Sequence, residues 1–240
     1  MPSALKPRAT LAALKRDVNA LRDPERAQFL QRFFRTGAGE YAEGDRMLGL
    51  TVPDSRKIAR GYADLPLEDV ATLLASPWHE HRLIALLILI VRHDRASEKE
   101  QKALHDFYLE HRAGVNNWDL VDTSARALFG EHDPKGRLAL RFAKSANLWD
   151  RRIAMVSTFA ALKRGETAPT FAVAEKLLDD QHDLIHKATG WLLREAGKVD
   201  HHALVAFLRQ HYARMPRTAL RYAIERLDPV DRRLWLVGPQ

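Results

Sequence analysis

Apolar residues recur every three or four positions through most of the chain, which is the spacing of one face of an α-helix. The first such run follows Thr10 and consists of Leu11, Leu14, Val18 and Leu21. Pro24 and Pro53 each suit the first turn of a later helix. No window shows convincing strand alternation, so we predict an all-α fold.

Helix boundaries are marked by local signals. Ser97 with Glu100 three residues later forms a capping box, and the glycine-rich stretch 37–45 is predicted to be a loop after the second helix. Pro and Gly residues stand at the expected connectors. Beyond the helices that begin near Thr10, Pro24 and Pro53, we predict helices over 67–76, 79–93, 98–112, 117–129, 136–144, 149–163, 170–179, 182–196, 200–213 and 216–226.

The helices carry an internal repeat. Arg82, Asn117, Arg152 and Lys187 follow one another at intervals of 35 residues, and Arg221 comes 34 residues later. A period of this length built from two helices is typical of TPR or HEAT arrays, and the TPR consensus is absent. We therefore predict one domain over 1–240, a right-handed solenoid of HEAT-like antiparallel helix pairs. Its parts are N-terminal helices and a loop (1–52), repeats (53–227) and a tail (228–240).

Equivalent positions in stacked repeats align on one surface, usually the concave one. The repeated cations and the asparagine are therefore predicted to line a concave basic groove that suits a periodic polyanion. The alternative is that these side chains pair with acidic neighbours between repeats, for which Asp119 and Asp150 are available.

Composition narrows the function. The 240 residues contain 46% hydrophobic and 29% charged residues, as in a soluble globular protein. There is no cysteine, which excludes thiolate metal sites, cysteine nucleophiles and disulfides. The net charge of +7 and pI near 9.8 favour an anionic partner, most commonly nucleic acid.

The longest apolar run, residues 83–91, is about half as long as a membrane-spanning helix requires. The N-terminus has no signal-peptide core, so we expect a cytoplasmic protein without membrane association.

Tryptophans and carboxylates provide the candidate chemistry. Trp118 and Asp122 are four residues apart on a predicted helix, which places the indole and the carboxylate one turn apart on one face. Trp149 and Trp191 fall in the next two repeats. An aromatic ring beside a carboxylate in a basic groove suits chemistry on a nucleobase. The alternative is that each indole simply packs in the core.

Four stretches, together with residues 147–154, resemble the AlkD-type DNA alkylation repair family in their order and spacing. They run from Phe33 to Asp45, from Leu48 to Pro53, from Asn117 to Asp122 and from Lys187 to Glu195. The resemblance covers most of the chain. It implies that the chain is a HEAT-like-repeat DNA glycosylase, an enzyme that removes N3- and N7-alkylated purines from duplex DNA. In that family the lesion is understood to stay in the base stack.

The resemblance also implies residue roles. Asp122 matches the carboxylate near the anomeric carbon of the sugar, and Trp118 and Trp191 match two aromatic residues that flank the lesion's backbone. Arg152 matches an arginine that holds a phosphate. Lys187 and Arg194 fall in the same motif and are expected to contact the DNA backbone. With them we group three further candidates for DNA binding, which are Arg82, Asn117 and Thr51. Thr51 stands in the Gly-x-x-x-Pro loop where some members have glutamine.

Two competing interpretations remain. His182 and His186 with Asp183 could ligate a metal, and His79-Glu80 is like the His-Glu pairs of HEAT-like di-iron hydroxylases, but this order occurs only once. We expect no metal and no cofactor. The stronger rival is a non-catalytic HEAT scaffold that binds DNA or protein, which would have no use for the Trp118, Asp122 and Trp191 set. We expect a monomeric glycosylase that needs no obligate protein partner.

Overall fold

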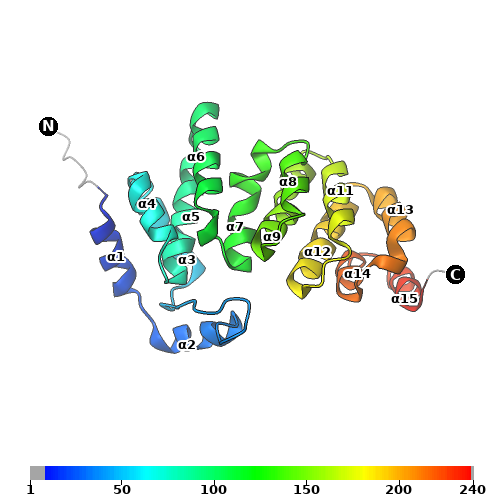
Figure 1. Ribbon diagram of the computed structural model, residues 1–240, viewed down its shortest axis with the longest axis horizontal. Helices are drawn as coiled ribbons and strands as arrows, with labels where there is room; N and C mark the ends of the chain where they lie inside the picture. Colours follow the sequence, from blue (N-terminus) through cyan, green and yellow to red (C-terminus); the bar gives the residue numbers. More distant parts are fainter. Residues whose placement is uncertain (1–8, 239–240) are drawn as a thin grey trace. The chain divides into compact units, whose positions relative to one another are not determined.

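The computed structural model of the chain describes residues 9–238. The described residues form helices joined by turns and loops, with one isolated β-bridge between Arg46 and Trp78. The all-α prediction is therefore confirmed for this part of the chain (Figure 1). The N-terminal segment 1–8, on which the signal-peptide argument rested, lies outside the described residues, as do residues 239–240.

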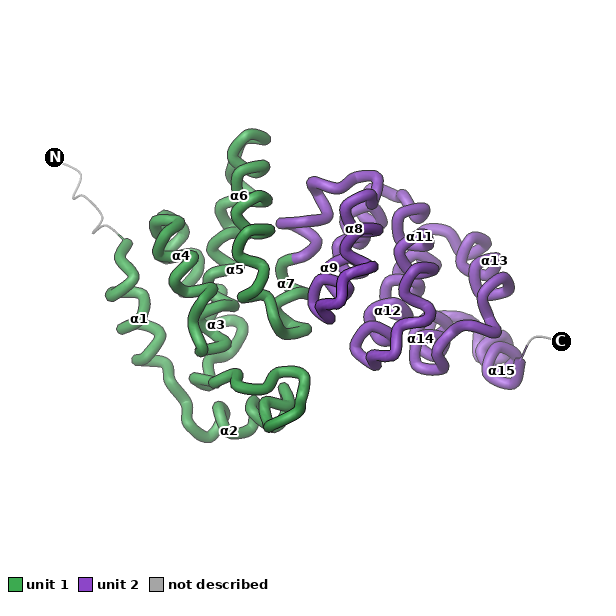
Figure 2. Tube along the Cα trace, in the orientation of Figure 1, with its two compact units in different colours: residues 1–124 green, residues 125–240 purple. Residues whose placement is uncertain are grey.

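The chain divides into two compact units, residues 1–124 and 125–240, which we call the first and the second unit (Figure 2). The division falls inside helix α7 (Trp118–Leu128). The predicted single domain over 1–240, and a solenoid that includes both units, stay predictions. The other helices of the first unit are α1 (Leu11–Ala20), α2 (Pro24–Phe33), α3 (Val52–Gly61), α4 (Leu67–Leu74), α5 (His79–His93), α6 (Glu98–Glu110) and the 3-10 turn η1 (Arg112–Gly114).

Helix α5 is the centre of the first unit. Twelve of its fifteen residues are buried, as expected for a helix that is apolar on nearly all sides. It packs against α3, α4 and α6, and α1 packs against α3. The buried Ser124 on α7 donates to the Tyr108 hydroxyl on α6, so α7 belongs to this core as far as Ser124.

The second unit is a double layer of paired helices. One layer contains α8 (Arg137–Phe142), α11 (Ala168–Leu177) and α13 (His201–His211), and the other contains α9 (Leu148–Ser157), α12 (Asp183–Val199) and α14 (Arg217–Ala223). Arg152, Lys187 and Arg221 are each the fifth residue of their helix in the second layer. The repeat seen in the sequence is thus a repeat of packing within this unit. The remaining elements are η2 (Gly130–His132), α10 (Phe159–Lys163), η3 (Tyr212–Arg214) and α15 (Pro229–Val237).

Two details differ from the sequence prediction. The helix predicted over 149–163 is two helices, α9 and α10, separated at Thr158. The hydroxyls of Ser157 and Thr158 donate to the backbone oxygens of Ala154 and Met155 and so compete with the helical ladder. The tail after 227 contains helix α15, which no pattern had indicated. Tyr212 donates to the Trp235 carbonyl at 3.0 Å, which holds this helix on the second unit.

None of the described helices combines the length and the apolar character that crossing a lipid bilayer requires.

Candidate functional site

The start of α7 is held by a buried carboxylate from the glycine-rich loop. Asp45 accepts hydrogen bonds from His79 at 3.1 Å and from Asn117 at 3.2 Å, and it forms an ion pair with Arg82. These donors come from α5 and from the residue before α7, so one side chain joins the loop to both helices. Asn117 also accepts the Trp118 amide at 2.8 Å, which caps α7.

His79 extends this network to α7. Its second ring nitrogen contacts Asp119 at 2.7 Å, so the imidazole lies between two carboxylates. Burial alone would lower the pKa of His79, but Asp119 and Asp45 together raise it to about 9. The ring is therefore an imidazolium at neutral pH, and with Arg82 it balances the two carboxylates. A buried network with balanced charges gives α7 a fixed starting point.

A second carboxylate, that of Glu80, holds the end of the loop that precedes α3. Glu80 is buried and accepts the backbone N–H groups of Leu48 at 2.8 Å, Gly49 at 2.7 Å and Leu50 at 3.3 Å. Thr51 follows and caps α3, because its hydroxyl accepts the Asp54 amide and donates to the Asp54 carboxylate at 2.5 Å. The predicted DNA-binding residue Thr51 is therefore held by its capping role, and a contact to DNA stays a prediction.

Aromatic side chains surround the start of α7. Trp118 stacks on Phe34 with ring centroids 5.2 Å apart, and Phe33 meets its ring edge-on at 5.9 Å. The indole N–H donates to the Tyr41 hydroxyl at 3.2 Å. Burial raises the pKa of Tyr41, so the phenol stays protonated at neutral pH. Trp118 is thus part of a cluster but remains partly exposed.

Asp122 lies one helical turn after Trp118 on α7 and is also partly exposed. Because both residues belong to one regular helix, the predicted placement of the indole and the carboxylate on one face is confirmed. The buried network orients this face, since it holds the two residues that precede and follow Trp118. A carboxylate beside an aromatic ring on a fixed helix can stabilise positive charge that develops on a bound group.

The second unit contains the other predicted residues on α9 and α12. Arg152 is buried, and its guanidinium donates to the Leu184 carbonyl in the first turn of α12. Lys187 is accessible and pairs with Asp183 at 2.7 Å. Trp191 is partly exposed and packs against Phe159 at 6.2 Å. Arg194 forms an ion pair with Glu225.

The family of this chain follows from its similarity to known proteins. The family model described as DNA alkylation repair enzyme matches residues 14–227. The chain belongs to this family. Its structure is also similar to that of a predicted DNA alkylation repair enzyme from Enterococcus faecalis, with a TM-score of 0.66 and 17% sequence identity over 87% of this chain and 97% of that one. At that identity the likeness bears on the fold. No curated protein matches the sequence significantly.

Membership of the DNA alkylation repair family gives the chain a role in DNA repair. It also gives weight to the resemblance from which residue roles were drawn. Trp118 and Asp122 lie together in the first unit, whereas Trp191, Arg152, Lys187 and Arg194 belong to the second. The roles of all six stay predictions.

The predicted row of exposed cations is wrong for its first members. Arg82 is 3% exposed and Asn117 is fully buried, and each contacts the Asp45 carboxylate. Arg152 is 5% exposed, so only Lys187 and Arg221 offer accessible charge at the repeat position. At its first three positions the period of 35 residues therefore reflects packing inside the fold, and phosphate contacts at the two accessible positions stay a prediction. Arg82 and Asn117 instead hold the loop and the start of α7 from inside the fold.

The histidines considered as metal ligands have other partners. His182 caps α12 by accepting the Leu184 amide at 3.1 Å, and His186 bonds the Asp180 carbonyl. His79 and Glu80 hold the loop, as described above. Among the described residues there is no group of three His, Asp or Glu placed to hold a metal ion.

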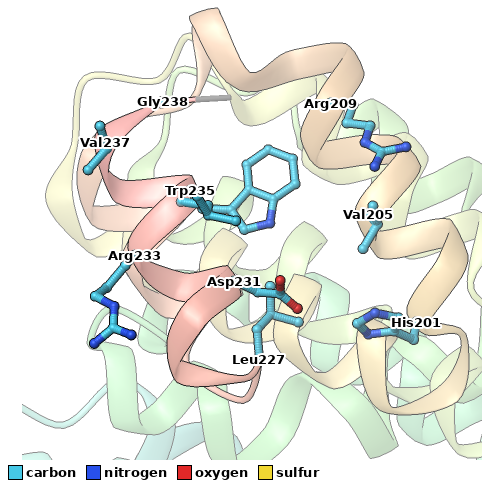
Figure 3. A pocket seen from close by; sticks show the side chains of 10 residues that line it. His201, Val205, Arg209, Leu227, Asp231, Arg233, Trp235, Val237 and Gly238 are labelled. Carbon is cyan, nitrogen blue, oxygen red and sulfur yellow. The ribbon is translucent and has the colours of Figure 1, made fainter. Parts of the chain in front are cut away.

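A cavity of about 660 Å³ lies between α13 and α15 in the second unit (Figure 3). Trp235 points into it, and His201, Arg209 and Asp231 line its walls. None of the predicted site residues lines this cavity. A duplex is recognised over an open surface, so we do not place the repair site there.

Sequence reasoning missed Asp45, His79 and Tyr41 as supports of the site. Asp45 and Tyr41 lay within a stretch that carried the family resemblance, but nothing local indicated a partner 34 or more residues away. In the sequence, His79 forms only half of a possible metal motif, with Glu80 as the other half. A buried histidine between two carboxylates has no signature in a single sequence.

Proposed function

We propose that this chain is a DNA glycosylase that excises cationic N3- and N7-alkylated purines from duplex DNA. The observation that carries the proposal is the pair Trp118 and Asp122, one turn apart and partly exposed on a helix whose start is held by a buried network. Family membership supports a repair role. We further propose that the protein acts in the cytoplasm as a monomer.

The proposed reaction requires few catalytic groups from the protein. An N3- or N7-alkylated purine already carries positive charge, so the base leaves with the electrons of its glycosidic bond as a neutral molecule. The sugar becomes an oxocarbenium-like cation, and water adds to its anomeric carbon and loses a proton. Asp122 would stabilise this cation and accept the proton. Because the carboxylate acts on the sugar, the lesion need not enter a base pocket.

The aromatic and basic residues have complementary roles in this proposal. The indoles of Trp118 and Trp191 would pack against the sugar-phosphate backbone beside the lesion, and an aromatic face also attracts positive charge. Lys187 and Arg194 would contact phosphates, after exchanging Asp183 and Glu225 for the DNA. Arg152 would contact a phosphate only after giving up contacts that it makes within the fold, such as the one to the Leu184 carbonyl.

The decisive experiment measures release of 7-methylguanine from methylated duplex DNA. Asp122→Asn keeps the size of the side chain and removes its charge, and we expect release to fall by about 10²–10³-fold with DNA binding retained. The control is Asp106→Asn, which removes a carboxylate from an exposed pair on α6. This control should release the base at the wild-type rate.

The other outcomes are equally informative. If neither wild type nor variant releases the base while both bind DNA, the protein is a non-catalytic HEAT scaffold. If Asp122→Asn and wild type release it equally, Asp122 has no part in the mechanism.

A further inference from the structure

Helix α2 in the first unit has none of its residues buried, although it carries large apolar side chains. Phe29 is 59% exposed and Phe33 is 54% exposed. The two residues are four apart, so they lie on one face of the helix. Their rings are nearly parallel, with an angle of 18° and centroids 6.1 Å apart. We call these two side chains the Phe29/Phe33 patch.

The fold does not need both rings for its own packing. A surface helix normally turns its apolar face to the core, and in this region the buried aromatic residue is Phe34, which stacks on Trp118. The N-terminus of α2 is held by other means, since the Asp23 amide donates to Leu48 and Arg26 donates to Gly49. The exposed rings are therefore available to a partner.

The Phe29/Phe33 patch is continuous with the candidate site. Phe33 contacts Trp118 edge-to-face at 5.9 Å and Phe34 at 5.1 Å. All four aromatic rings belong to the first unit. A ligand that stacks on the patch would therefore lie beside the helix that carries Trp118 and Asp122.

Positive charge accompanies the patch. Arg32 lies on α2 beside Phe33, and Arg35 follows the end of the helix; both are exposed. At the other end Arg22 packs over the Trp78 ring at 5.2 Å. Aromatic residues and arginine are also enriched in protein–protein interfaces, but this chain belongs to a DNA repair family. Aromatic rings interleaved with arginines are typical of surfaces that stack single bases and hold their phosphates, so we take nucleic acid as the partner.

We propose that the Phe29/Phe33 patch is a stacking site for a nucleobase that has left the DNA helix next to the lesion. Arg32 and Arg35 contact the phosphates beside that base. The inference rests on the proposed function only in taking DNA as the partner, and it requires no base excision. Stacking of this kind tolerates any base, because every base has an aromatic face.

The test compares two labelled duplexes that differ by one unpaired adenine, so that one has a bulged base and the other is fully paired. Neither contains an alkylated base. Dissociation constants are measured by fluorescence anisotropy over a range of salt concentrations. We expect the wild type to prefer the bulged duplex. Phe29→Leu with Phe33→Leu keeps apolar area but removes the aromatic faces, and its preference should fall about tenfold.

Matched variants separate stacking from other effects. Phe29→Leu alone alters the ring that does not touch Trp118 and should lose part of the preference. Phe29→Tyr with Phe33→Tyr keeps the aromatic faces and should retain the preference. Arg32→Gln should weaken binding of both duplexes equally and lower the salt slope by about 0.9 for each lost phosphate contact. Urea unfolding verifies that each variant is folded.

Several results would overturn the inference. One is a bulge preference that is absent in the wild type or unchanged in the leucine variants. Another is an equal loss on both duplexes, which would make the patch a general contact. A wild-type dimer in sedimentation velocity that the leucine variants lose would assign the patch to self-association. A bulge preference without release of 7-methylguanine would sustain the stacking site and refute the glycosylase.

Discussion

At the scale of single residues, His79 in the first unit is a buried histidine in contact with two carboxylates. It lies between Asp45 and Asp119, and their carboxylates raise its pKa to about 9 against the opposing effect of burial. A histidine whose pKa is raised by folding stabilises the folded state fully below its unfolded pKa near 6.5 and loses that contribution as the pH rises through about 9. The positive charge matters because a neutral ring can donate to only one of the two carboxylates.

This predicts a pH-dependent difference between the wild type and His79→Gln. At pH 6 the variant should be the less stable protein, and the part of the difference that comes from the charge is about 3 kcal/mol, from 1.36 kcal/mol for each unit of pKa shift. The difference should shrink between pH 6.5 and 10, because the wild type loses its charge there and glutamine has none. Urea unfolding at a series of pH values measures it. Parallel pH profiles for the two proteins would show that His79 is not charged in the folded state.

Gly49 allows a second test at this scale. Its φ of +88° favours glycine, and a Cβ there would lie 2.1 Å from the Asp23 carbonyl oxygen. Gly39 has a similar φ of +76° with nothing within 4 Å. Gly39→Ala should cost only the conformational penalty of about 1–2 kcal/mol. Gly49→Ala should cost clearly more, because the backbone of α2 must move. Equal losses in urea unfolding would mean that the contact relaxes without cost.

At the scale of elements, the loop between α2 and α3 is organised by α5. Glu80 gathers the three amides of Leu48, Gly49 and Leu50, while Asp45 returns from the loop to α5 and α7. The helices themselves could be predicted, because apolar periodicity and caps such as Thr10 act within one or two turns. These bonds could not, because they join residues 30 or more positions apart.

Glu80→Gln tests this organisation. The glutamine amide places an N–H₂ group against a backbone donor, so at least one buried amide loses its acceptor, at a cost of about 1–3 kcal/mol. Hydrogen exchange at Leu48, Gly49 and Leu50 should accelerate, while the amides of α9 and α12 stay protected. Glu175→Gln, at an exposed position of α11, is the matched control. Unchanged protection at the three amides would contradict the role of Glu80.

At the scale of the whole molecule, the excess of positive charge predicts DNA binding that weakens steeply with salt. The slope of log affinity against log salt should be about 0.9 for each phosphate contact. Because Arg82 and Asn117 are buried, the contacts must come from accessible residues such as Lys187, which is 43% exposed at its side chain. The concave basic groove stays a prediction, and two of the residues predicted to line it, Arg82 and Asn117, are buried.

Lys187→Gln should remove one phosphate contact and so lower the salt slope by about 0.9. It should leave the stability of the fold almost unchanged, since the exposed pair of Lys187 with Asp183 contributes about 0–1 kcal/mol. Lys102→Gln removes a similar exposed pair with Asp106 on α6 and is the control. Anisotropy titrations between 50 and 200 mM salt, conditions chosen to span a strong dependence, distinguish them. An equal slope for Lys187→Gln and wild type would remove Lys187 from the DNA contacts.

The sequence by itself determined the helical class, most helix positions and the neighbourhood of Trp118 and Asp122, because these depend on periodicity and on spacing within one helix. It could not determine which charged residues are exposed. Arg82 and Lys187 occupy the same place in the 35-residue repeat, yet one is buried on Asp45 and the other is accessible. Only the tertiary structure decided this, since burial of a charge depends on the partners that distant segments bring to it.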